Sequence, residues 1–183
     1  EVSALRQATN EAELLAKASE QATPKSFIGA LNHVAGQDEN ALICEMKRRS
    51  PSAGDILPGA NPVDIARDYE RGGAACLSVL TDGPSFGGSV EDFVAIRNAV
   101  ELPMLRKDFM IDPLQVVEAR AIGADAVLVI LSCCDDALAA DLIATAHGLN
   151  MNTLIETHTR DELDRALNLK GSNIGINNRD LTR

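Results

Sequence analysis

Along the chain, short runs of consecutive apolar residues alternate with longer segments in which apolar residues recur every three or four positions. Six short runs span residues 41–46, 75–80, 103–106, 126–131, 153–156 and 173–177. Continuous apolar runs of this length are typical of parallel strands covered on both faces, and the segments between them are typical of covering helices. The pattern therefore predicts an α/β protein with six successive strand–helix units.

Capping residues mark where these helices begin. A polar side chain that accepts a hydrogen bond from the first turn favours a helix start, and proline directly after it suits the first helical position. The predicted caps are Asn61, Ser89, Asp112, Asp135 and Thr159. The cap at position 89 predicts a helix over residues 90–100, and the amphipathic stretches over residues 2–18 and 26–34 predict extra helices before the first strand.

Repeated strand–helix units fold either as a doubly wound open sheet or as an eight-stranded barrel. A dinucleotide-binding sheet favours G-x-G-x-x-G after its first strand, whereas residues 48–54 read R-R-S-P-S-A-G. We therefore expect a (β/α)8 TIM barrel. In this interpretation residues 1–183 are one barrel domain, with residues 1–40 as an N-terminal helical extension and residues 41–183 as units one to six.

The chain is short for such a barrel, because eight units take about 250 residues. We expect it to be C-terminally incomplete, so that two strand edges and the inner apolar layers lie open. We expect these edges and apolar layers to be covered by the rest of a longer natural protein, by a complementing C-terminal segment, or by a second copy in a homo-oligomer.

The charge balance excludes some partners. Seventeen Lys and Arg against 27 Asp and Glu give a net charge of −10, which would repel nucleic acid. No apolar stretch approaches the length of a membrane span, so we expect no membrane partner. The four cysteines form no CxxC pair and lie in or beside apolar runs, which favours free thiols and a cytoplasmic location.

Polar residues stand at the ends of several predicted strands, where the strands of a barrel converge on one face. Each alone reads equally well as a loop residue or a helix cap, but together they predict a shared cleft. They are Glu45, Lys47, Lys107, Asp108, Glu156, Asn177, Asn178 and Arg179.

Two further candidates are less specific. Glu156 and His158 have a spacing compatible with a metal, but the histidines are scattered and a surface or capping role is favoured, so we expect no metal. Phe86 suits either a loop anchor packed on the core or an aromatic wall for a planar substrate.

Residues 45–54, E-M-K-R-R-S-P-S-A-G, resemble the E-x-K-x-x-S-P-S-x-G motif of the indole-3-glycerol phosphate synthase family. Further similar blocks follow in order: S-V-L-T-D at 78–82 with Phe86, L-R-K-D-F at 105–109, G-A-D at 123–125 and G-I-N-N-R-D-L at 175–181. The resemblance extends over most of residues 26–181.

The resemblance implies a (β/α)8 enzyme that converts 1-(2-carboxyphenylamino)-1-deoxyribulose 5-phosphate into indole-3-glycerol phosphate in tryptophan biosynthesis. The reaction releases CO2 and water and uses no cofactor. Lys107 would protonate the sugar carbonyl during ring closure, and Lys47, Glu45 and Glu156 would supply the second acid and the base, without deciding which carboxylate removes the final proton. The substrate-binding positions would be Ser50, Phe86, Asn177 and Arg179.

Some features depart from the family. Residues 83–85 read G-P-S where many members have E-K-Y, and the phosphate-binding loops after strands seven and eight fall outside residues 1–183. The alternatives are therefore a non-catalytic or complementation-dependent barrel fragment, and a barrel enzyme that uses Lys107 or Lys47 as a Schiff-base nucleophile. Borohydride trapping with substrate would separate the Schiff-base enzyme from the synthase.

Overall fold

The computed structural model describes residues 2–171 and 173–178, and the main sheet of these residues has six parallel strands. The strands are β1 (Ile43–Met46), β4 (Cys76–Leu80), β5 (Met104–Lys107), β6 (Ala126–Ile130), β7 (Asn152–Thr157) and β8 (Asn173–Ile176). Their spatial order is their order in sequence, and every neighbouring pair is parallel. The six predicted strands are thus confirmed, with boundaries that differ by one or two residues.

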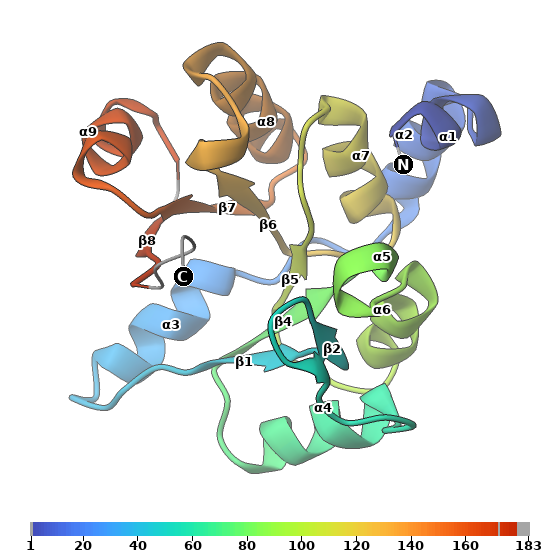
Figure 1. Ribbon diagram of the computed structural model, residues 1–183, viewed down its shortest axis with the longest axis vertical. Helices are drawn as coiled ribbons and strands as arrows, with labels where there is room; N and C mark the ends of the chain where they lie inside the picture. The colour runs from blue at the N-terminus through green and yellow to red at the C-terminus, as the bar shows by residue number, and fades with distance from the viewer. Residues whose placement is uncertain (1, 172, 179–183) are drawn as a thin grey trace.

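The sheet is curled, with helices around its outer side (Figure 1). These helices are α4 (Pro62–Arg71), α6 (Val90–Arg97), α7 (Pro113–Ala121), α8 (Asp136–Gly148) and α9 (Arg160–Asn168). Within the described residues β1 and β8 do not pair with each other, so the curl is open between them. The described residues thus form six strands of a TIM-barrel-like sheet with five outer helices between them, in agreement with the predicted fold class.

The predicted caps all form. Asn61, Ser89, Asp112, Asp135 and Thr159 each accept a hydrogen bond from a backbone N–H in the first turn of the helix that follows. Each cap satisfies one of the N–H groups that have no partner inside the helix. The helix predicted over residues 90–100 ends at Arg97, three residues early.

The N-terminal region differs from the prediction. The single helix expected over residues 2–18 is two helices, α1 (Val2–Ala8) and α2 (Glu11–Glu20), because the Asn10 side chain accepts from the Ala12 N–H and starts a new helix. Helix α3 (Phe27–Ala35) follows near the expected position. Leu14 and Ala18 of α2 pack against Leu114 and Val117 of α7, which fastens the extension to the barrel.

Alternation along the strands divides the core in two. Outward-facing residues such as Met104, Val127 and Ile155 pack against the surrounding helices. Inward-facing residues such as Leu105 and Leu128 form a second cluster, which Phe27 of α3 joins. The inner face is therefore apolar at this level, and residues two positions further along each strand face the same way.

Short elements at the carboxyl ends of the strands were not predicted. A hairpin of β2 (Arg49–Ser50) and β3 (Gly54–Asp55) follows β1, the one-turn helix α5 (Gly83–Phe86) follows β4, and the 3-10 turn η1 (Leu131–Cys133) follows β6. Arg49 of the hairpin donates to the carbonyl of Pro84 in α5 over 2.6 Å, so the two loops support each other.

A candidate active site at the carboxyl ends of the strands

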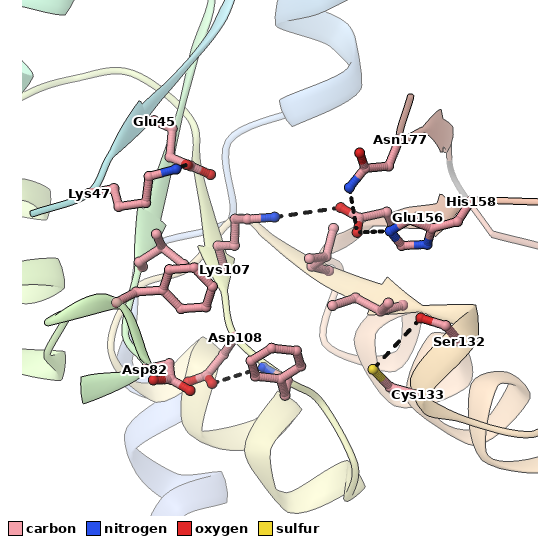
Figure 2. A pocket seen from close by; sticks show the side chains of 15 residues that line it. Glu45, Lys47, Asp82, Lys107, Asp108, Ser132, Cys133, Glu156, His158 and Asn177 are labelled. Atoms are coloured by element: carbon pink, nitrogen blue, oxygen red, sulfur yellow. Dashed lines mark hydrogen bonds and ion pairs between the residues drawn. The ribbon is translucent and has the colours of Figure 1, made fainter. Parts of the chain in front are cut away.

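A cavity of about 360 Å³ opens at the carboxyl ends of the strands (Figure 2). Its wall combines charged side chains from the strand ends with apolar side chains from the inner face. The lining residues include Glu45, Lys47, Leu80, Phe86, Lys107, Phe109, Leu128, Ile130, Glu156, His158 and Asn177. A cleft with apolar walls and a few convergent charges is typical of a small-molecule site.

Glu45 and Lys47 form one side of the cavity. The two residues are two positions apart on and just after β1, so both side chains face inward. Lys47 Nζ lies 2.8 Å from Glu45 Oε1, and each side chain is about 30% exposed, at 27% and 31% respectively. The pair is held at the cavity rim, where the Tyr69 hydroxyl donates to the carbonyl of Glu45 over 3.2 Å.

Lys107 and Glu156 face each other across the inner surface (Figure 2). Lys107 ends β5 and Glu156 lies on β7, and the Lys107 Nζ to Glu156 Oε2 distance is 3.5 Å. Asn177, just beyond β8, donates from Nδ2 to Glu156 Oε1 over 3.2 Å. The predicted convergence of side chains from separate strands is what the structure shows for these residues.

The backbone on both sides of Lys107 is anchored by a buried ionic cluster. Arg106 is 4% exposed and points outward, where its guanidinium lies 2.7 Å from Glu118 and 3.1 Å from Asp108. Its Nε donates to the Thr81 hydroxyl over 3.0 Å. An arginine held by three separate partners has little freedom, which limits the positions that Lys107 can take.

Two aromatic rings form another wall. The ring centroids of Phe86 and Phe109 are 6.4 Å apart with a tilt of 32°. Phe86 ends α5, which Asp82 caps by accepting from the Ser85 N–H over 2.7 Å. Of the two alternatives for Phe86, the geometry supports the cavity wall.

The structure does not bring the other two predicted binding residues, Ser50 and Arg179, into this description for different reasons. Ser50 is not among the cavity-lining residues, because it is buried in the hairpin and its hydroxyl accepts from the Ala53 N–H over 3.1 Å. Arg179 lies outside the described residues.

Several lining residues were not assigned to a cleft from the sequence, and Phe109 and His158 are two of them. Phe109 reads as an ordinary apolar residue, and only its place two positions after Lys107 hinted at the site. His158 was weighed as a metal ligand or a cap; residues 2–171 and 173–178 contain no group of three or more His, Cys, Asp or Glu side chains suited to a metal ion. Nor does that part of the chain contain a helix with the length and apolar character to cross a membrane.

Comparison with known proteins gives a consistent family. A family model described as indole-3-glycerol phosphate synthase matches residues 1–183. Proteins named indole-3-glycerol phosphate synthase from Hyphomonas neptunium and Rhodospirillum rubrum are 59% and 50% identical over 183 and 182 residues. These alignments cover 100% and 99% of this chain, and the chain spans 69% of the length of each relative.

Among solved structures, a mandelate oxidase complex aligns with a TM-score of 0.56 and 14% identity, over 79% of this chain and 57% of that one. An N-acetylmannosamine-6-phosphate 2-epimerase from Clostridium perfringens aligns with a TM-score of 0.50 and 15% identity, over 72% of this chain and 58% of that one. At these identities the likeness concerns the fold alone.

Proposed function

The chain belongs to the indole-3-glycerol phosphate synthase family, and we propose that its cavity converts 1-(2-carboxyphenylamino)-1-deoxyribulose 5-phosphate into indole-3-glycerol phosphate. The protein is thus a carboxy-lyase of tryptophan biosynthesis. We place this reaction in the cytoplasm. The observation that carries the proposal is the meeting of Lys107, Glu156 and the Glu45 with Lys47 pair in one cavity beside two phenylalanine rings.

Ring closure is the first step. The aromatic carbon that carries the carboxylate attacks the ketone carbon of the sugar, and the ketone oxygen takes a proton. An ammonium group at that oxygen both donates the proton and stabilises the negative charge as it develops. Lys107 has this role in our proposal, and its contact with Glu156 at 3.5 Å supports it, because the carboxylate keeps the ammonium over the cavity.

Decarboxylation and dehydration complete the reaction. The carboxylate leaves as CO2, and its bonding electrons restore the aromatic ring. The new hydroxyl then takes a proton from an acid and leaves as water, while a base removes a proton from the adjacent CH2 to form the indole double bond. Lys47 is the proposed acid and either Glu45 or Glu156 the base, and the sequence of steps is redox-neutral, so acids and bases are sufficient.

The aromatic and amide side chains of the cavity bind or orient the substrate in this proposal. Phe86 and Phe109 would hold the planar ring, since aromatic side chains favour tilted and offset contacts with such groups. Asn177 reaches the reacting centre through Glu156. The family resemblance also implies substrate contacts for Ser50 and Arg179, of which Ser50 does not line the cavity.

A fluorescence assay for indole formation tests the proposal. In the protein expressed from its complete gene, Lys107→Ala should lower kcat by about a thousandfold or more, because one charge-stabilising donor contributes ~10²- to 10³-fold and general acid catalysis adds to this. Its thermal midpoint should stay close to that of the wild type, since the side chain is 25% exposed.

Lys17→Ala serves as the matched control, because Lys17 is an exposed lysine on α2 away from the cavity. Wild-type turnover in Lys107→Ala would remove that lysine from the mechanism. Absence of product from the wild-type protein would reject the proposed function as a whole.

A further inference from the structure

His158 is placed between two carboxylates at the edge of the cavity. Its Nε2 lies 3.3 Å from Glu156 Oε1, and its Nδ1 lies 3.6 Å from Glu162 Oε2 (Figure 2 shows the ring beside Glu156). The imidazole is 11% exposed. Both ring nitrogens therefore face acceptor oxygens, and solvent reaches little of the ring.

Local structure explains this position. His158 follows Glu156 by two residues at the end of β7, so the two side chains project in the same direction. The N–H of His158 donates to Glu162 Oε2 over 2.7 Å, and Thr159 caps α9 by accepting from the Glu162 N–H over 3.2 Å. These two hydrogen bonds resemble a capping box displaced by one residue, and they fix the backbone on both sides of the histidine.

The Nδ1 atom of the ring is in an energetically unfavourable position. Nδ1 is buried and has no hydrogen-bond partner in the described part of the chain, because Glu162 lies beyond hydrogen-bond distance. Buried polar atoms normally have partners, and an exception calls for a physical reason. A leucine of similar size would remove the unpartnered nitrogen, so fold stability alone does not account for a histidine here.

The reason lies in Glu156. Its Oε1 is contacted by His158 Nε2 at 3.3 Å and Asn177 Nδ2 at 3.2 Å, whereas its Oε2 faces Lys107 Nζ at 3.5 Å. The Asn177 amide donates to this oxygen, and a proton on His158 Nε2 would give it a second donor. Two donors on one oxygen would fix the rotation of the carboxylate and leave the other oxygen toward the lysine. We propose that His158 is a positioning residue that holds Glu156 against Lys107. The charged groups near the ring are Glu156 on the same strand, Glu162 on α9 and, beyond Glu156, Lys107 on β5.

This inference rests on the proposed function, and a pair of variants tests it in the protein expressed from its complete gene. His158→Leu removes the donor, and we expect kcat to fall by about 10- to 100-fold, the worth of a hydrogen bond to a charged group. KM should change less than about threefold, because the ring contacts Glu156 and, at 11% exposed, offers little surface to the substrate. His158→Gln can still donate to Glu156, and we expect it to recover most of the lost kcat.

The control is His147→Gln, since His147 is an exposed histidine on α8, and it should leave both constants unchanged. A merely structural role would lower the thermal midpoint of both position-158 variants and leave kcat per folded molecule alone. That result, or equal kcat in His158→Leu and the wild type, overturns the proposal.

A measurement without turnover keeps the two proposals apart. The ring nitrogens of His158 are followed by ¹⁵N NMR in the wild type and in Glu156→Gln, with His147 as internal reference. We expect the Nε2 signal of His158 to move in the variant and that of His147 to stay. An Nε2 signal that does not move in Glu156→Gln overturns the positioning role. If the signal moves in Glu156→Gln but the wild-type protein makes no indole product, the proposed function alone is overturned.

Discussion

At the scale of single residues, strand alternation places consecutive side chains in different environments. Arg106 faces outward into a buried ionic cluster, while Lys107 faces the cavity and is 25% exposed. A lysine at position 106 could not reproduce the arginine's contacts, because one ammonium cannot bridge two carboxylates and a hydroxyl in the planar geometry that a guanidinium offers. The rigidity of this stretch thus comes from one face of the strand and its chemistry from the other.

The aromatic wall makes a separate prediction. Phe109→Ala should raise KM about tenfold with a smaller effect on kcat, because burying a phenylalanine against a planar ligand contributes ~1.5–3 kcal/mol and this residue is 41% exposed without substrate. Steady-state kinetics measure the change, with Leu15→Ala on α2 as a control of similar exposure, at 44%. An unchanged KM would exclude Phe109 from the binding wall.

The sequence identified some of these residues and not others for a physical reason. Glu45, Lys47, Lys107 and Glu156 interrupt or end apolar runs, and charges at the ends of several strands together indicate a cleft, although each alone does not. Phe109 and His158 carry no such signal, because an aromatic residue after a strand resembles core and a histidine before a helix resembles a cap. Only the path of the loop decides where their side chains point.

At the scale of elements, the loop after β4 depends on one glycine. A Cβ added to Gly88 would overlap the backbone of Leu80, and the Gly88 N–H donates to the Asp82 carbonyl over 3.0 Å. Gly88→Ala should therefore destabilise the protein by about 1–3 kcal/mol and displace α5 with Phe86. Chemical denaturation measures the loss.

Gly148→Ala is the matched substitution, because a Cβ at that position at the end of α8 meets no atom within 4 Å. It should be neutral or slightly stabilising, since alanine favours the helix. Equal stability of the two variants would show that the contact at Gly88 yields easily and that the loop does not depend on it.

Long regular elements were predictable and short ones were not. Strands such as β6 and helices such as α8 carry their own apolar pattern and caps. The two-residue strands β2 and β3 and the four-residue α5 have no room for a pattern, and contacts such as Arg49 with the Pro84 carbonyl determine them. The break at Asn10 was missed because the apolar positions on its two sides read as one continuous amphipathic stretch.

At the scale of the whole molecule, burial of the Cys76 thiol in the inner core is expected to lower the free energy of unfolding at alkaline pH. Burial, with a smaller effect from the nearby Asp125, raises the pKa of Cys76 from 9.0 to about 12. The neutral thiol therefore contributes stability that is complete below pH 9.0 and is lost as pH rises toward about 12, because the unfolded state loses its proton first.

Denaturation curves between pH 8 and pH 11 would measure this dependence, and Cys76→Ala should have a flatter profile. In the same range Cys133, which is exposed, should react with a thiol reagent while Cys76 stays protected. Rapid labelling of Cys76 in the folded protein would contradict its burial.

The curl of the sheet brings the inward-facing side chains of β5 and β7, the two neighbours of β6, toward each other, and with them Lys107 and Glu156. A crystal structure of the protein from its complete gene, bound to the substrate analogue whose ketone is reduced to an alcohol, tests this arrangement. The alcohol oxygen should lie about 3 Å from Lys107 Nζ, within hydrogen-bond reach, with the anthranilate ring against Phe86 and Phe109. An analogue bound with that oxygen out of reach of Lys107, or outside the cavity, would contradict the assignment.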